Sequence, residues 1–513
     1  MSVERVLIRL EPLSVEVQAP RGALLSSSLS LRGLEFPCGG TGLCGGCGVR
    51  LLAGSLPVSE ADLAVFSARQ LAEGWRLACQ ARAEGPLVLE CGQWEMDVLT
   101  DSSCLAGAGR PGLGIAVDLG TTTIAAQIVE MATGKVLGVE TILNPQAPFG
   151  SNVMNRIQAV LSGADLTSVV RLAVGKMIAK LARGREQEIV EVVLVGNTVM
   201  HHLFAGLDVE PLAHVPFHSP HLGVQCFQAR DLGWPLPSAC RIRFERCLGG
   251  FVGSDILAGI LAAGMHRAED MVALVDLGTN GEIAIGNRHG IVCASTAAGP
   301  AFEAGSIRMG MRAATGAIAY VSLSDGELRA TVIGGADPRG ICGSGLVDAV
   351  AMGLRAGAIL SSGRIACSTR LFPVKDPVVL CQADIRELQL AKAAIASGFR
   401  LLLKRMGASA AGLGRVCLAG AFGNYVQAES AIGIGLLEAP VERIHASGNT
   451  ALHGAKILLL SAGEPVLPRI EHVNLAAEPG FQDGFVECIA FPEKHEGVSR
   501  VAGKGTGAAD SGQ

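Results

Sequence analysis

The chain has 513 residues, of which 49% are hydrophobic and 17% charged, and its formal net charge is -5. This composition excludes a disordered protein, and the mildly acidic balance gives no support to nucleic-acid binding or to a polybasic membrane surface. Mean hydropathy is +0.40, yet no run of about 18 apolar residues lacks a charge and the N-terminus lacks a secretory apolar core, so we expect a cytoplasmic protein without a membrane span.

Residues 1–95 are predicted to form a small β-rich domain. Short alternating apolar runs at 6–10, 15–17, 49–52 and 87–89 are typical of strands. From residue 96 to 112 the composition shifts to Asp, Ser, Ala, Gly and Pro, which predicts a linker.

Four cysteines within the first domain have the spacing of an iron–sulfur site. Cys38, Cys44 and Cys47 form a C-x5-C-x2-C pattern, and Cys79 follows in Arg-Leu-Ala-Cys-Gln. Three close cysteines and a distant fourth predict a 2Fe–2S cluster, and glycines between them let the backbone approach the sulfides. A zinc knuckle is the alternative, but zinc ribbons usually carry two C-x2-C pairs. Cys91 is a rival fourth ligand that lacks the sequence context of Cys79.

From residue 113 the chain alternates apolar strands with Ala/Leu-rich helical segments, an α/β pattern. Val-Asp-Leu-Gly-Thr occurs at 117–121 and again at 275–279, an offset of 158 residues (275 minus 117). A repeat of domain length predicts two related lobes, 113–270 and 271–492, with the end of the second returning to the first. The tail 493–513 is expected to be disordered.

The two repeated turns predict a nucleotide site. An aspartate at a strand end can hold Mg²⁺-bound water, and the glycines and hydroxyls after it can donate to phosphate. We therefore expect Asp118 and Asp276 to be catalytic. The residues expected to contact ATP in these turns are Gly120, Thr121, Thr122 and Thr123 in the first and Gly278, Thr279, Asn280, Gly281 and Glu282 in the second.

Later glycine turns complete the predicted site. The strand at 416–419 runs into a turn with Gly420, Gly423 and Asn424, which suits a nucleoside lying on the backbone. A helix start at 448–455 follows. Gly343, Ser344 and Gly345 form another turn, which either donates N–H groups to phosphate or packs a helix. In order, the turns resemble the phosphate 1, phosphate 2, adenosine and connect motifs of the acetate and sugar kinase, heat-shock chaperone and actin superfamily (ASKHA). That resemblance implies ATP and Mg²⁺ as cofactors.

Four other polar residues have open roles. His201 and His202 show no metal-binding spacing, so a place in the core or on a helix surface is favoured. Asp255 and Glu303 either face the cleft between the lobes or cap helices.

The combination of motifs resembles the reductive activators of corrinoid-dependent enzymes (RACE proteins) over about residues 6–492. The resemblance is carried by 38–47, 76–80, 144–146, 196–202, 276–282, 299–303, 340–345 and 419–424. It implies an α+β ferredoxin-like (β-grasp) domain followed by a two-lobed α/β ASKHA ATPase (actin-like, ribonuclease H-like). Two departures are expected: a missing middle domain, and a C-terminus that has only Cys488 where some relatives carry a cysteine cluster.

The resemblance also implies a function. ATP hydrolysis would drive one-electron reduction of inactive Co(II) to Co(I) in a corrinoid protein or corrinoid-dependent methyltransferase, through the 2Fe–2S cluster. The expected partners are that corrinoid protein, an upstream electron donor and a second copy of the chain, with no nucleic acid and no membrane. The alternatives are an ATP-driven electron donor to another low-potential enzyme, and a non-enzymatic redox or nucleotide-sensing module.

Overall fold

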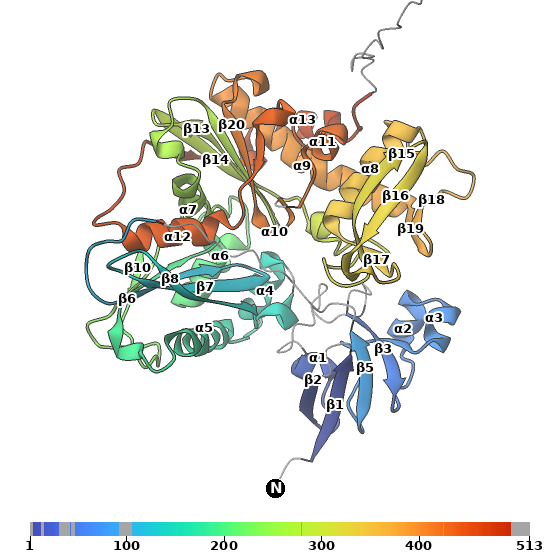
Figure 1. Cartoon of the computed structure of the whole chain (residues 1–513), viewed down its shortest axis with the longest axis horizontal. Coiled ribbons are helices and arrows are strands. Elements are labelled where there is room, and N and C mark those ends of the chain that lie inside the picture. The colour runs from blue at the N-terminus through green and yellow to red at the C-terminus, as the bar shows by residue number, and fades with distance from the viewer. Residues whose placement is uncertain are drawn as a thin grey trace, which may run out of the picture.

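The computed structural model describes residues 4–11, 15–29, 42, 47–91, 105–150, 152–278, 280–423 and 425–493. It contains a five-stranded sheet, two six-stranded sheets and two small ones (Figure 1). The part of the predicted linker at 96–104 and the predicted tail beyond residue 493 lie outside the described residues.

The N-terminal domain is a five-stranded sheet in the order β2-β1-β5-β3-β4. Its first strand alternates exposed and buried side chains, which is why one face builds a core. The four predicted strands are confirmed. The elements are β1 (Arg5–Glu11), β2 (Val15–Pro20), α1 (Leu25–Leu29), β3 (Gly48–Ala53), α2 (Glu60–Val65), α3 (Ala68–Ala72), β4 (Trp75–Leu77) and β5 (Leu87–Cys91).

Two six-stranded sheets share one topology, so the sequence repeat is a structural repeat. In each, three antiparallel strands are followed by two parallel ones, in the orders β8-β7-β6-β9-β11 and β14-β13-β12-β20-β21. The edge strands β10 and β22 complete the sheets. The alternating hydrophobic pattern is weak here because both faces are covered by helices.

The first sheet and its helices consist of β6 (Leu113–Leu119), β7 (Thr123–Glu130), β8 (Val136–Leu143), α4 (Val153–Leu161), α5 (Leu166–Ala182), β9 (Ile189–Val195), α6 (Thr198–Ala205), β10 (Gln225–Phe227), β11 (Arg241–Phe244) and α7 (Ser254–Ala262). The second consists of β12 (Val272–Leu277), β13 (Gly281–Asn287), β14 (Gly290–Thr296), α9 (Gln382–Arg405), β20 (Arg415–Ala419), α10 (Gly420–Gly423), α11 (Ala428–Gly433), β21 (Ile444–Ala446), α12 (Thr450–Leu460), β22 (Ile470–His472) and α13 (Phe481–Glu487).

Helices α7 and α12 lie between the two sheets, and each packs on the sheet formed by the other segment of the chain. Helix α7 ends the first segment of chain but packs on the second sheet, while α12 belongs to the second segment and packs on the first. The two helices approach closely at Gly454, where a Cβ would lie 2.0 Å from the carbonyl oxygen of Ala258. Only glycine allows this contact, so the lobes are joined through a tightly packed helix pair (Figure 1).

A smaller subdomain is inserted in the second lobe. It is built from β15 (Ala317–Ser324), β16 (Glu327–Val332), β17 (Gly340–Ile341), α8 (Gly343–Ala356), β18 (Leu371–Lys375) and β19 (Val378–Cys381). In Figure 1 it lies above the N-terminal domain, and Arg339 forms an ion pair with Glu90 of that domain.

The described part of the predicted linker, 105–112, is packed against the first lobe. Ala108 donates its N–H to the Met131 carbonyl (2.8 Å), and Arg110 donates to the carboxylate of Glu191 and to the Leu459 carbonyl. Glu191 is buried and also accepts from two arginines of β11, Arg241 and Arg243. Glu191 therefore joins the linker to the first sheet, and its partner Arg110 extends the connection to α12.

We predict that Glu191→Gln lowers the free energy of unfolding. The loss should stay below the roughly 3–5 kcal/mol expected for breaking a fully buried ion pair, because the Arg241 side chain remains 62% exposed. Thermal and urea unfolding measure it. The control is Glu188→Gln, whose exposed ion pair with Arg185 should contribute within about 0.5 kcal/mol. Equal stability of the two variants would contradict a stabilising role for Glu191.

Candidate functional site

Cys47 and Cys79 lie on neighbouring strand ends in the N-terminal domain. Strand β3 begins directly after Cys47, and β4, its antiparallel partner, ends two residues before Cys79. The N–H of Ala78 donates to the carbonyl of Cys47 (3.1 Å), which fixes the two segments together. Both cysteines are buried, as cluster ligands in a protein-lined site must be.

Gly42, the described glycine between Cys38 and Cys44, lies close to the same region. At Gly42 φ is +80°, and a Cβ there would lie 3.0 Å from the Cβ of Ala61 and 3.2 Å from the Gln80 side chain. A glycine is needed for this approach. The contacts fit a cluster-binding loop, but Cys38 and Cys44 lie outside the described residues, so their roles as ligands stay predictions.

Four carboxyl groups converge between the lobes. Asp118 and Asp276 occupy equivalent positions near the ends of β6 and β12. Asp255 lies in the first turn of α7, and Glu282 lies in β13. Glu282 is buried, whereas the three aspartates keep some exposure to solvent.

The carboxyl groups repel one another. Desolvation raises the pKa of Asp118 to about 6. Desolvation and then the charge of Asp118 raise the pKa of Asp276 to about 7. Desolvation, with the charges of Asp276 and Asp118, raises the pKa of Asp255 to about 8. Desolvation and the charges of Asp255 and Asp276 raise the pKa of Glu282 well above its usual range. Such a cluster favours a bound cation.

Residues from the second lobe complete the cluster. Asn449, the N-cap residue of α12, donates its side-chain N–H to Asp118 (2.9 Å). At Gly420, φ is +81° and a Cβ would lie 2.6 Å from Oδ1 of Asp276. The start of α10 therefore lies against the second aspartate, and the start of α12 against the first.

Three side chains donate hydrogen bonds to the first predicted phosphate turn. Asn144 donates to the carbonyl of Gly120 (2.8 Å), and Asn197 donates to the hydroxyl of Thr121 (2.8 Å). Arg156 is buried and donates to the carbonyl of Thr121. These three hydrogen bonds stabilise the turn, which Thr122 and Thr123 follow.

The second turn is less fully described, since Thr279 lies outside the described residues. Gly278 donates its N–H to the carbonyl of Asn280 (3.1 Å). Gly281 packs closely, because a Cβ there would lie 2.6 Å from the side chain of Ile395. Asn424 also lies outside the described residues, and Gly423 is in α10. Contact of these residues with ATP stays a prediction.

The turn at the start of α8 has the contacts of a packing turn. A Cβ at Gly343 would lie 1.7 Å from the Phe302 carbonyl oxygen, and one at Gly345 would lie 2.2 Å from the Ile318 carbonyl oxygen. Ser344 donates its hydroxyl to the Ala319 carbonyl (2.8 Å). Of the two interpretations from sequence, these contacts favour helix packing, and a phosphate role stays a prediction.

His201 and His202 are buried in α6, so the core interpretation is confirmed. His202 contacts the hydroxyl of Ser219 (2.6 Å) and the carbonyl of Thr198 (2.8 Å). Desolvation lowers the pKa of both, to about 4 for His201. Neutral rings hydrogen-bonded to the protein support packing of the first lobe.

Sequence reasoning gave no role to Arg156 and no individual role to Asn144, Asn197 or Asn449. The asparagines lie within the family-like segments or the helix start noted above, but their partners are distant in sequence. Arg156 carries no motif; desolvation lowers its pKa to about 9, and the charge of Glu303 from the other lobe opposes that shift. Glu303 and Asp255 therefore both reach the region between the lobes.

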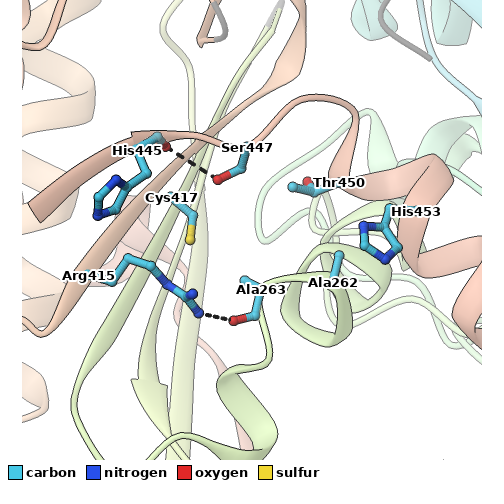
Figure 2. Close-up of a pocket in the computed structure, with 8 residues that line it drawn as sticks. All are labelled: Ala262, Ala263, Arg415, Cys417, His445, Ser447, Thr450 and His453. Carbon is cyan, nitrogen blue, oxygen red and sulfur yellow. Dashed lines mark hydrogen bonds between the residues drawn. The ribbon is translucent and has the colours of Figure 1, made fainter. Parts of the chain in front are cut away.

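A separate cavity of about 330 Å³ lies at the opposite end of α7 (Figure 2). It is lined by Ala262, Ala263, Arg415, Cys417, His445, Ser447, Thr450 and His453. Arg415 donates to the Ala263 carbonyl, as Figure 2 shows. Asp255 and Ala262 are separated by about 10 Å along the helix, at 1.5 Å per residue, and none of the four carboxyl residues lines this cavity.

Within the described part of the chain, every helix is too short or too polar to cross a bilayer.

Three family models match successive parts of the chain. Residues 8–84 match the 2Fe-2S iron-sulfur cluster binding domain, 113–268 the RACo middle region, and 270–501 the C-terminal ASKHA domain of RACo. The predicted ferredoxin and ASKHA folds are confirmed. The expectation that the middle domain is missing is wrong, because the region assigned from sequence to the first lobe matches that middle region.

Curated proteins and a solved structure resemble the chain over most of its length. The corrinoid activation enzyme RamQ of Eubacterium limosum is 35% identical over 424 residues, 74% of this chain and 71% of that protein. The [Co(II) methylated amine-specific corrinoid protein] reductase of Methanosarcina barkeri is 27% identical over 386 residues, 68% and 70% of the two chains. The structure of a reductive activator for a corrinoid, iron–sulfur protein matches with a TM-score of 0.64 and 27% identity over 95% of this chain and 98% of that one. The chain belongs to the family of reductive activators of corrinoid proteins.

Proposed function

We propose that this chain uses ATP hydrolysis to drive the reduction of inactive Co(II) to Co(I) in a corrinoid protein or corrinoid-dependent methyltransferase. One observation carries the proposal: this member of the family has both a buried cysteine pair and an aspartate site that is duplicated between the lobes. One electron would pass from an external donor through the N-terminal domain to cobalt, and ATP and water would give ADP and phosphate.

Cys47 and Cys79, with Cys38 and Cys44, would hold the 2Fe–2S cluster in this proposal. When bound, the cluster supplies a one-electron carrier. For Cys47 and Cys79, the protein's own contribution is to bury both side chains and to fix their spacing through the β3–β4 pair. Cys91, at the end of β5, is not assigned to the set.

Asp118 and Asp276 would position Mg²⁺ and the water that attacks the terminal phosphate of ATP. The support is electrostatic: neighbouring carboxyl groups with raised pKa values gain most from a divalent cation. Asn449 orients Asp118 through its hydrogen bond. The turn from Gly120 to Thr123 would donate to the phosphates. Assignment of Mg²⁺ and of these residues is part of the proposal.

The alternative of another low-potential electron acceptor is less well supported, since both long curated relatives are named for corrinoid proteins. The physiological electron donor, the corrinoid partner's identity and self-association are left to experiment.

Coupling of the two halves is tested with a Co(II) corrinoid protein, a strong reductant, ATP and Mg²⁺, by visible spectroscopy. Wild type should form Co(I) only with ATP, because the reduction is uphill. Cys79→Ala should form none although it hydrolyses ATP, and Cys91→Ala should behave as wild type. Co(I) formation at equal rates with and without ATP would contradict the proposal and favour a plain redox module.

Asp276→Asn should slow ATP hydrolysis by roughly 10²-fold or more, because it removes a carboxylate proposed to order Mg²⁺ and the attacking water. The cluster content should be unchanged, because Asp276 lies outside the N-terminal domain that holds the predicted cluster ligands. Phosphate release measures the rate, and Asp231→Asn, at an exposed position, is the matched control. Normal hydrolysis by Asp276→Asn would refute the assignment of this turn.

The carboxyl cluster predicts a pH dependence of stability. These groups hold protons more tightly in the folded protein, so the free energy of unfolding should fall as pH rises from about 4 through the pKa values of about 6 to 8. In metal-free thermal unfolding between pH 5 and 8, Asp255→Asn should lose less stability than wild type. Mg²⁺ should raise the wild-type Tm at pH 8 by roughly 1 °C for each kcal/mol of binding, the shift expected for a chain of this size. Equal pH slopes in the two proteins would exclude ionisation of Asp255 as the cause.

A further inference from the structure

Glu90 connects the N-terminal domain to the second lobe. Its carboxylate accepts from Arg50 of the neighbouring strand β3 (2.5 Å and 2.6 Å) and from Arg339 of the inserted subdomain. The Glu90 side chain is only 16% exposed, and that of Arg339 is 30% exposed. Partial burial and two arginine partners distinguish this contact from an isolated surface pair.

The N-terminal side of the contact leads directly to a predicted cluster cysteine. In the antiparallel pairing of β3 with β5, Arg50 lies opposite Glu90. Arg50 is three residues after Cys47, and no turn intervenes because β3 begins at Gly48. A displacement of Glu90 would therefore act on the strand that directly follows Cys47.

On the side of the inserted subdomain, the contact leads from Arg339 to α8. Arg339 donates its backbone N–H to the Gly316 carbonyl (2.8 Å), and its side chain crosses Gly316, where a Cβ would lie 2.6 Å from Cδ of Arg339. Strand β17 follows at Gly340 and pairs with β15, and the first turn of α8 begins at Gly343. Only the two-residue strand β17 and Cys342 separate Arg339 from the helix.

Helix α8 is in turn packed against the element beside Asp276. A Cβ at Gly343 would lie 2.9 Å from the ring of Phe422 in α10, and the rings of Phe302 and Phe422 are 5.0 Å apart. Helix α10 begins at Gly420, which lies against the Asp276 carboxylate. Packed groups thus run without interruption from the proposed nucleotide site to Glu90.

We propose that the Glu90–Arg339 ion pair transmits the nucleotide state of the ATPase lobes to the cluster-binding domain. A change at Asp276 on nucleotide binding moves α10 and α8, and β17 carries Arg339 with it, which shifts the β3–β5 strand pair. Glu90 and Arg339 are positioning residues, since neither contacts a proposed ligand. The inference rests on the proposed function for its ATP and cluster sites.

The test measures the cluster and does not depend on turnover. The reduced holoprotein is examined by electron paramagnetic resonance with and without Mg²⁺ and a non-hydrolysable ATP analogue, at saturating concentrations established by a separate binding titration. Wild type should show a nucleotide-dependent change in the cluster signal. Arg339→Gln should lose at least half of that change while keeping cluster content and analogue affinity within about twofold. Arg329→Gln, an exposed arginine on β16, is the matched control and should retain it.

A double-mutant cycle isolates the pair. Glu90→Gln should also reduce the response, and the double variant with Arg339→Gln should lose no more than the larger single loss. A full response in Arg339→Gln, or additive losses, would overturn the inference. A wild-type cluster signal that does not change when the analogue is added would also overturn it. ATP-dependent Co(I) formation by wild type, measured in parallel, distinguishes these outcomes from failure of the proposed function itself.

Discussion

The packing of α7 against α12 is the constraint on which the rest of the ATPase architecture depends. Each helix follows the last strand of one repeat and packs on the sheet of the other, and Gly454 lets their backbones meet at Ala258. Their first turns consequently enter the space between the lobes. Asp255 comes from α7, and Asn449 caps α12, so the helix pair places one residue of each lobe beside the duplicated aspartates. Lobe movement and site geometry are therefore mechanically linked.

The assembled site brings four carboxyl groups together in a largely desolvated region between the lobes. Burial raises the pKa of all four carboxyl groups, and the charges of neighbouring carboxylates raise it further for Asp255, Asp276 and Glu282. The hydrogen bond from Asn449 only partly offsets the effect of burial on Asp118. Binding of a cation and nucleotide would reduce the repulsion between these carboxylates, and this difference in free energy would favour a different arrangement of the site. The packed path through Phe422 and α8 offers that change a direct mechanical route to Glu90.

The fold was largely predictable because its strongest signals are local or repeated. The Val-Asp-Leu-Gly-Thr repeat predicted two lobes and the two strand-end aspartates, and alternation of apolar residues predicted the N-terminal strands. What sequence could not supply were contacts between distant segments. Asn449 reaches Asp118 across 331 residues, and Arg339 reaches Glu90 across 249. No local pattern marks either pair, and Arg156 is identified only by its burial behind Thr121. The glycines at the start of α8 show a second difficulty. Their local pattern is clear, but phosphate-binding turns and close helix packing both favour glycine, so the sequence does not distinguish the two roles.

The central claim is that the ATPase lobes drive electron transfer from the cluster to cobalt, and a single-turnover stopped-flow experiment tests it most directly. The protein is reduced, freed of excess reductant, and mixed with a Co(II) corrinoid protein, with or without ATP and Mg²⁺. The account predicts that cluster oxidation and Co(I) formation occur together, with the same rate constant and equal stoichiometry, and only with ATP. Equal rates without ATP, or a cluster that stays reduced after mixing with ATP, would contradict it.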